Sequence, residues 1–133
     1  MGDRSAIILV VDDEPDILRL VETILREAGH VVTAAGNADA AIRAMETMAV
    51  KPALLLTDVV MPGMSGPVLA EQMLAAVPGL RVLFMSGYDP RQVVRRYVVE
   101  KGFALIPKPF TSQSLLAAVD QALAAAQREA DPF

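Results

Sequence analysis

Three carboxylates and one lysine stand just after apolar runs of the sequence. Asp12 and Asp13 follow the run at residues 7–11, and Asp58 follows a second such run. Lys108 lies in a Pro-Lys-Pro-Phe segment. Two unit charges about 4 Å apart interact by roughly 4 kcal/mol at an effective dielectric constant near 20, so clustered carboxylates need a cation among them. Oxygen ligands select a hard ion, which favours Mg²⁺ over zinc.

Such a set of side chains suits the acceptance of a phosphoryl group. One carboxylate can attack phosphorus while the metal and a lysine neutralise the phosphoryl oxygens. A second interpretation stays open for the first pair of acids, because Asp13 or Asp16 can also cap the helix that begins near Pro15. The positions of Asp58 and Lys108 at strand ends favour the phosphoryl site.

The length and composition of the chain predict a single domain whose partner is a protein. The chain has 133 residues, enough to bury a full core, and a domain is expected at residues 5–127, with tails at 1–4 and 128–133. It has no cysteine, so neither a disulfide framework nor a thiolate metal site is expected, and the cytoplasm is the expected compartment. A net charge of −4 argues against direct nucleic-acid binding. The first apolar run ends too early, at Asp12, for a signal peptide or a membrane span.

Apolar runs alternate with helical patterns along the whole chain, which predicts an α/β fold with a parallel sheet covered by helices on both faces. Strands are expected at residues 6–11, 30–34, 53–58, 82–86 and 103–107. Five helices are expected, beginning near Pro15, Asn37, Pro67, Asp89 and Thr111. The first of them is expected to close at Gly29.

The candidate residues are expected to meet at one edge of this sheet. Ligands of open parallel sheets bind beyond the carboxyl ends of the strands. The strand order 2-1-3-4-5 is taken from known flavodoxin-like, doubly wound folds, which include a chemotaxis regulator, rather than from these residues. In that order, the strand before Lys108 lies roughly 10 Å from the strand of Asp58. We expect Lys108 to cover much of this gap and a phosphoryl group to cover the rest, with Ser86 midway.

Four motifs recur in an order and at separations that are similar to those of the receiver domain of two-component response regulators, over about residues 6–127. They are Val10-Val11-Asp12-Asp13-Glu14-Pro15, Thr57-Asp58 with Met61-Pro62-Gly63-Met64-Ser65-Gly66, Ser86-Gly87 and Lys108-Pro109-Phe110. The resemblance implies that Asp58 accepts a phosphoryl group from a phosphohistidine on a sensor histidine kinase or a histidine phosphotransfer protein. It also implies a signalling domain rather than an enzyme.

The resemblance implies a role for each remaining site residue. The Mg²⁺ ligands would be Asp13, Asp58 and the backbone carbonyl of Val60, with Asp12 acting mostly through water. Ser86 and Lys108 would bind phosphoryl oxygens, and the peptide bond between Lys108 and Pro109 would be cis.

Phosphorylation is expected to move the loop of Ser86 and so to change the surface formed by the fourth helix, the fifth strand and the fifth helix. A homodimer through that surface is a further expectation. The family usually has an aromatic switch residue three positions before the lysine, where this chain has Leu105. Tyr88 or Phe103 could replace it, and we hypothesise Tyr88. Val60 and Tyr88 flank the route of an attacking water, which predicts a long-lived phosphoryl group.

Two other classes of function remain as alternatives. One is a Mg²⁺-dependent, phosphatase-like hydrolase, although Val60 stands where a second carboxylate would serve as general acid or base. The other is a receiver-like interaction module that does not use phosphorylation. No output domain is expected from the residues after the last helix, which leaves a free-standing shuttle or the receiver of a hybrid sensor kinase.

Overall fold

The computed structural model describes residues 5–87, 96, 98 and 100–130. Its elements in chain order are β1 (Ile7–Val11), α1 (Pro15–Glu27), β2 (Val31–Ala35), α2 (Ala38–Thr47), β3 (Leu54–Asp58), α3 (Gly66–Ala76), β4 (Arg81–Ser86), β5 (Ala104–Pro107) and α5 (Ser112–Ala130). Four of the five predicted helices are therefore present in the described part of the chain. The predicted helix that begins near Asp89 falls mainly on residues outside it.

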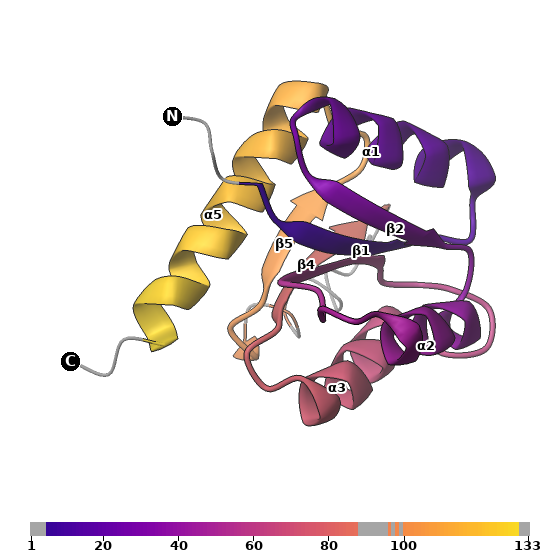
Figure 1. Ribbon diagram of the computed structural model, residues 1–133. Coiled ribbons are helices and arrows are strands. Elements are labelled where there is room, and N and C mark those ends of the chain that lie inside the picture. The colour runs from indigo at the N-terminus through magenta and orange to yellow at the C-terminus, as the bar shows by residue number, and fades with distance from the viewer. Residues whose placement is uncertain (1–4, 88–95, 97, 99, 131–133) are drawn as a thin grey trace.

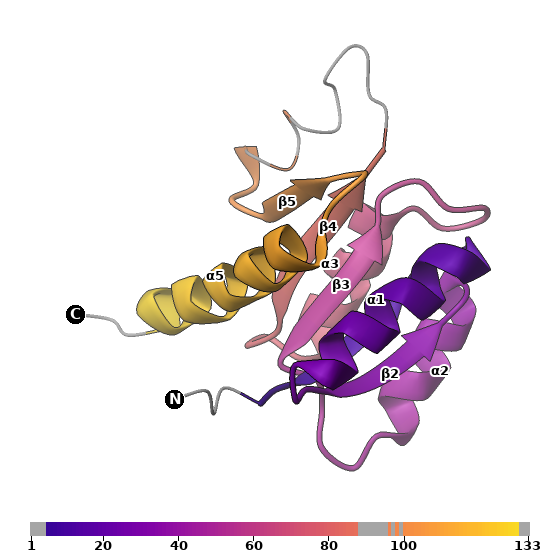
Figure 2. The same cartoon turned by 90° about the horizontal axis from the view of Figure 1, so that it is seen from above.

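The five strands form one parallel sheet in the order β2-β1-β3-β4-β5. This is the flavodoxin-like order that was expected. Helices α1 and α5 cover one face of the sheet, and α2 and α3 cover the other (Figures 1 and 2). Because all strands run the same way, the segments that follow β1, β3, β4 and β5 come together at one edge.

The core consists of two apolar layers, one on each face of the sheet. Alternate residues of β1 belong to different layers: Leu9 packs in the layer beneath α2 and α3, whereas Ile8 packs in the layer beneath α1 and α5. All five residues of β3 are buried, as a central parallel strand covered on both faces requires. The central strand therefore places its last residue, Asp58, at a buried position in the middle of the sheet.

Local capping fixes where the helices begin. The N-cap of α1 is Glu14, which makes no side-chain cap, and its N–H donates to Asp12 Oδ1 at 2.8 Å. The expected caps at Asp13 and Asp16 are therefore wrong, because the N-cap position is Glu14 and Asp12, two residues before Glu14, accepts the bond from its N–H. Gly29, with φ of 100°, follows α1 as predicted. The predicted cap of α5 is present, since Thr111 Oγ1 accepts from Ser114 N–H at 3.0 Å.

Candidate functional site

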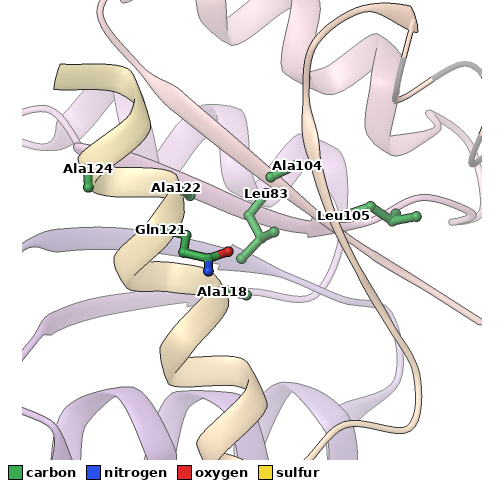
Figure 3. A pocket seen from close by; sticks show the side chains of 7 residues that line it. All are labelled: Leu83, Ala104, Leu105, Ala118, Gln121, Ala122 and Ala124. Carbon is green, nitrogen blue, oxygen red and sulfur yellow. The ribbon is translucent and has the colours of Figure 1, made fainter. Parts of the chain in front are cut away.

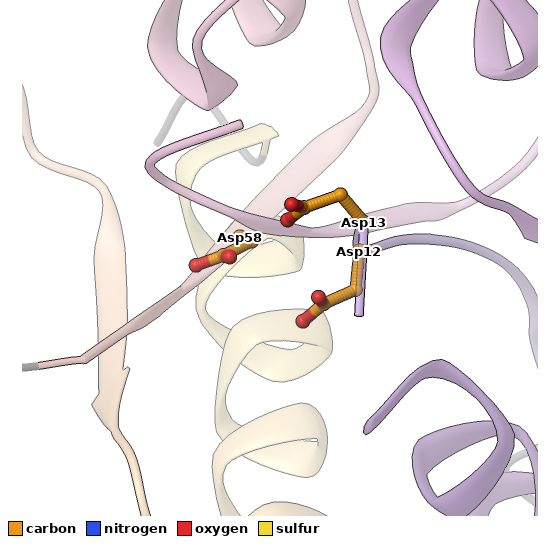
Figure 4. A group of neighbouring side chains, drawn as sticks. All are labelled: Asp12, Asp13 and Asp58. Carbon is orange, nitrogen blue, oxygen red and sulfur yellow. The ribbon is translucent and has the colours of Figure 1, made fainter. Parts of the chain in front are cut away.

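Three aspartates converge at the carboxyl edge of the sheet. Asp12 and Asp13 follow β1, Asp58 ends the adjacent strand β3, and each offers an oxygen within 4.8 Å of the others (Figure 4). Asp12 is fully buried, Asp58 is 8% exposed and Asp13 faces solvent. The sequence prediction that these three acids form one cluster is confirmed. Their all-oxygen ligand set suits a hard divalent cation such as Mg²⁺.

Lys108 lies among the carboxylates. Its Nζ is 3.0 Å from Asp12 Oδ2, 3.4 Å from Asp58 Oδ2 and 3.5 Å from Glu14 Oε1. The expectation that Lys108 covers only part of the gap to Asp58, with a phosphoryl group covering the rest, is wrong, because the extended side chain itself reaches Asp58 Oδ2. The backbone N–H of Lys108 donates to the carbonyl of Ser86 at 2.7 Å, which places this side chain next to the end of β4.

The sequence analysis did not predict the ion pair between Glu14 and Lys108. The carboxylate of Glu14 is mostly exposed, but it reaches the lysine. Its only signal in the sequence is its place directly after the aspartate pair.

The surroundings of Asp58 and Lys108 shift the pKa of both groups. Burial raises the pKa of Asp58 above its ordinary value; the charge of Asp12 adds to this, and that of Lys108 opposes it. Burial alone would lower the pKa of Lys108, but its hydrogen bond to Asp12 and the negative charges of Asp58 and Asp12 outweigh burial and raise it. The pocket therefore favours a charged lysine and disfavours a second buried negative charge, as expected where a cation is still needed.

The remaining polar groups hold Asp58 and flank it. The N–H of Val59 donates to Asp58 Oδ1 at 2.9 Å, which fixes one carboxylate oxygen. Ser86 is buried at the end of β4, between the strands of Asp58 and Lys108, and its hydroxyl donates to the carbonyl of Gly87 at 3.4 Å. Val60 is 73% exposed beside the cluster.

The peptide bond between Lys108 and Pro109 is cis, the isomer that the resemblance implied.

The expected switch residues are only partly described. Tyr88 lies outside the described residues. Leu105 packs in the apolar layer beneath α2 and α3, opposite Phe84 of β4. Phe103 makes an edge-to-face contact with the buried Phe84, with ring centroids 5.4 Å apart and planes at 76°. Phe103 is therefore partly buried against the core, two residues before the position where the family usually has its aromatic switch.

Two cavities lie away from the carboxylates. One, of about 490 Å³, opens between α5 and strands β4 and β5, where α5 presents Ala118 and Ala122 and the side chain of Leu105 points away from the helix (Figure 3). The other, of about 310 Å³, is lined by residues that include Arg81 and Lys101. The three aspartates line neither of these two cavities. Among the described residues, no helix is long and apolar enough to span a membrane.

Comparison with known families decides the relationship. The response regulator receiver domain family matches residues 8–120. The chain belongs to this family. Receiver domains are signalling domains of two-component systems, and they generally bind Mg²⁺ at an acidic pocket. The structure of this chain has a cluster of three aspartates of the kind that such a pocket requires.

Relatives of known name and structure agree with this assignment. The chain is 30% identical to the sensor kinase CckA of Brucella abortus over 119 residues, which is 90% of this chain and 13% of CckA. It is 30% identical over 129 residues to the DNA-binding transcriptional regulator NtrC of Salmonella typhimurium, covering 97% of this chain and 27% of NtrC. A receiver domain protein from Clostridium thermocellum superposes with a TM-score of 0.80 at 26% identity, covering 92% of this chain and 97% of that one. The chain thus spans a small part of both longer relatives.

Proposed function

We propose that Asp58 accepts a phosphoryl group from a phosphohistidine on a sensor histidine kinase or a histidine phosphotransfer protein. The observation that carries the proposal is the placement of three carboxylates within 4.8 Å of one another, with Lys108 Nζ 3.4 Å from Asp58. Buried like charges are costly, and a structural site would not need them. The free-energy cost of burying these carboxylates together is offset if a cation and a phosphoryl group complete the cluster.

The transfer is a displacement at phosphorus. A carboxylate oxygen of Asp58 attacks, and the new O–P bond forms as the P–N bond to the donor imidazole breaks. The electron pair of that P–N bond returns to the imidazole nitrogen, and Asp58 neither gains nor loses a proton. Lys108 holds positive charge beside the phosphoryl oxygens, which its raised pKa favours at neutral pH.

Mg²⁺ would be held by Asp12, Asp13, Asp58 and the backbone carbonyl of Val60, with Asp12 contributing mostly through water. When bound, the ion supplies positive charge that neutralises the phosphoryl oxygens. The oxygen-only donor set and the net negative charge of the cluster both support this choice of metal.

The response to phosphorylation is proposed to begin at Ser86, whose hydroxyl would donate to a phosphoryl oxygen. The carbonyl of Ser86 accepts from the backbone N–H of Lys108, so movement of Ser86 would alter the surface to which β5 and α5 contribute, together with the helix predicted to begin near Asp89. That surface is where we expect a target or a second copy of the chain to bind. The exchange is expected in the cytoplasm, which is typical of the family.

Intact mass spectrometry tests the acceptor. The native chain, Asp58→Asn and Asp120→Asn are incubated with phosphoramidate, with and without Mg²⁺. Asp120 is an exposed aspartate of α5 and serves as the matched control. We expect the native chain and Asp120→Asn to gain the mass of one phosphoryl group only with Mg²⁺, and Asp58→Asn to gain none. Equal labelling of Asp58→Asn would contradict the proposal.

A further inference from the structure

A glycine with no role in the proposed chemistry stands where the loop after β3 meets α3. Gly66 is the first residue of α3. A β-carbon built on it would clash with the carbonyl oxygen of Asp58 and would lie 3.1 Å from the carbonyl carbon of Asp58. None of the other glycines that the structure describes has any atom within 4 Å of such a carbon. Close approach to Asp58, and not a left-handed backbone, therefore requires glycine at this position.

Hydrogen bonds hold the two successive peptide groups on either side of Val59. The N–H of Gly66 donates to the carbonyl of Val59 at 2.8 Å, and the hydroxyl of the fully buried Thr57 donates to the carbonyl of Asp58 at 3.0 Å. The N–H of Val59 donates to Asp58 Oδ1 at 2.9 Å and is shared with the carbonyl of Met85 in β4 at 3.1 Å. The first turn of α3 thus rests on the peptide group whose N–H orients the carboxylate.

We propose that Gly66 is a positioning residue for the phosphoacceptor. The absence of a β-carbon lets the start of α3 sit directly on the peptide group after Asp58. This contact fixes the direction of the carboxylate and carries any displacement of Asp58 to α3. The inference rests on the proposed role of Asp58. Displacement at phosphorus depends on alignment, and a misplacement of about 1 Å can slow a reaction on the order of 100-fold.

The test compares Gly66→Ala with two controls. Gly36→Ala adds the same methyl group where no atom lies within 4 Å, and Ser65→Ala removes the side-chain cap of α3, which accepts from the N–H of Val68, without adding an atom. Phosphorylation by phosphoramidate is measured at saturating Mg²⁺ and at a temperature where thermal unfolding shows each variant folded. We expect Gly66→Ala to react at least about tenfold more slowly and to shift the amide resonance of Val59. Both controls should keep the native rate and the native resonance.

A second measurement does not depend on the fold of the variant. In the native chain, Mg²⁺ with beryllofluoride should shift the amide resonance of Gly66 and leave that of Gly36 in place. A folded Gly66→Ala that reacts at the native rate, or an unshifted Gly66 resonance, would overturn the positioning role. A native chain that is never phosphorylated would instead overturn the proposed function of Asp58.

Discussion

The amino and carboxyl ends of the parallel strands differ in the number of their buried polar groups and in the partners of those groups. Of the five buried polar or charged residues that the structure describes, His30 alone lies at the amino end, and the other four lie at the carboxyl ends: Asp12, Thr57, Asp58 and Ser86. His30 is satisfied locally, since its Nδ1 accepts from the N–H of Ala6 at 3.1 Å. At the carboxyl end, the aspartates face one another and depend on one lysine. The amino end therefore contributes stability, whereas the carboxyl end holds the charges that we propose serve phosphoryl transfer.

Removal of the lysine should give the largest effect. Lys108→Met leaves Asp12 and Asp58 without their cation, and the loss of one partner from a buried ion pair typically costs about 3 kcal/mol. We expect a loss of that size in urea unfolding at pH 7 without Mg²⁺. Lys51→Met is the control: Lys51 is exposed and donates to the carbonyl of Met45, so about 1 kcal/mol is expected. Equal losses of unfolding free energy in Lys108→Met and Lys51→Met would contradict the claim that the carboxyl end holds charges that depend on this lysine.

The amino end should show a purely structural effect. His30→Ala leaves the N–H of Ala6 without its acceptor and should lower the free energy of unfolding by about 2 kcal/mol. His30→Asn places an oxygen near the position of Nδ1 and should recover about half of this loss. Phosphorylation rates of both folded variants should match that of the native chain, and a slow His30→Asn would show that the two ends are coupled.

Asp58→Asn should stabilise the chain modestly at pH 7 while it abolishes phosphorylation. Because the pKa of Asp58 is raised in the folded chain, the folded state binds more protons than the unfolded state between the ordinary aspartate pKa and the raised value. Native stability therefore falls as pH rises through that window, and the variant should lack this fall. We expect a gain of about 1 kcal/mol, measured by urea unfolding as a function of pH. A destabilised variant would mean that Lys108 compensates fully for the buried charge.

The smallest effect is expected at the rim of the site. Val60→Asn replaces an exposed apolar side chain and should change stability by less than about 0.5 kcal/mol. The loss of the phosphoryl group should nevertheless become faster, by less than about tenfold, because an apolar neighbour hinders the attacking water. The decay of the phosphorylated mass over time measures this directly. Slower decay in the variant would contradict the predicted long lifetime.

Much of this arrangement could be predicted because the pattern is local. Apolar runs that stop at Asp12 and Asp58 mark strand ends, and the geometry of parallel sheets places such ends together. The strand order came from known folds, since pairing between distant segments leaves no local pattern in the sequence. The pairing of Lys108 with Glu14 and Asp58 depends on where tertiary structure places the backbone after β5. The need for glycine at residue 66 was equally hidden, because it arises from contact with β3.

The central claim is that the acid cluster binds a hard divalent ion and makes Asp58 a phosphoryl acceptor. A crystal structure with Mg²⁺ and beryllofluoride tests it most directly. The account predicts beryllofluoride on an oxygen of Asp58, the metal among Asp12, Asp13 and Asp58, and Lys108 Nζ beside a fluorine atom. Density for neither ion at these side chains, at concentrations that saturate other receiver domains, would contradict it.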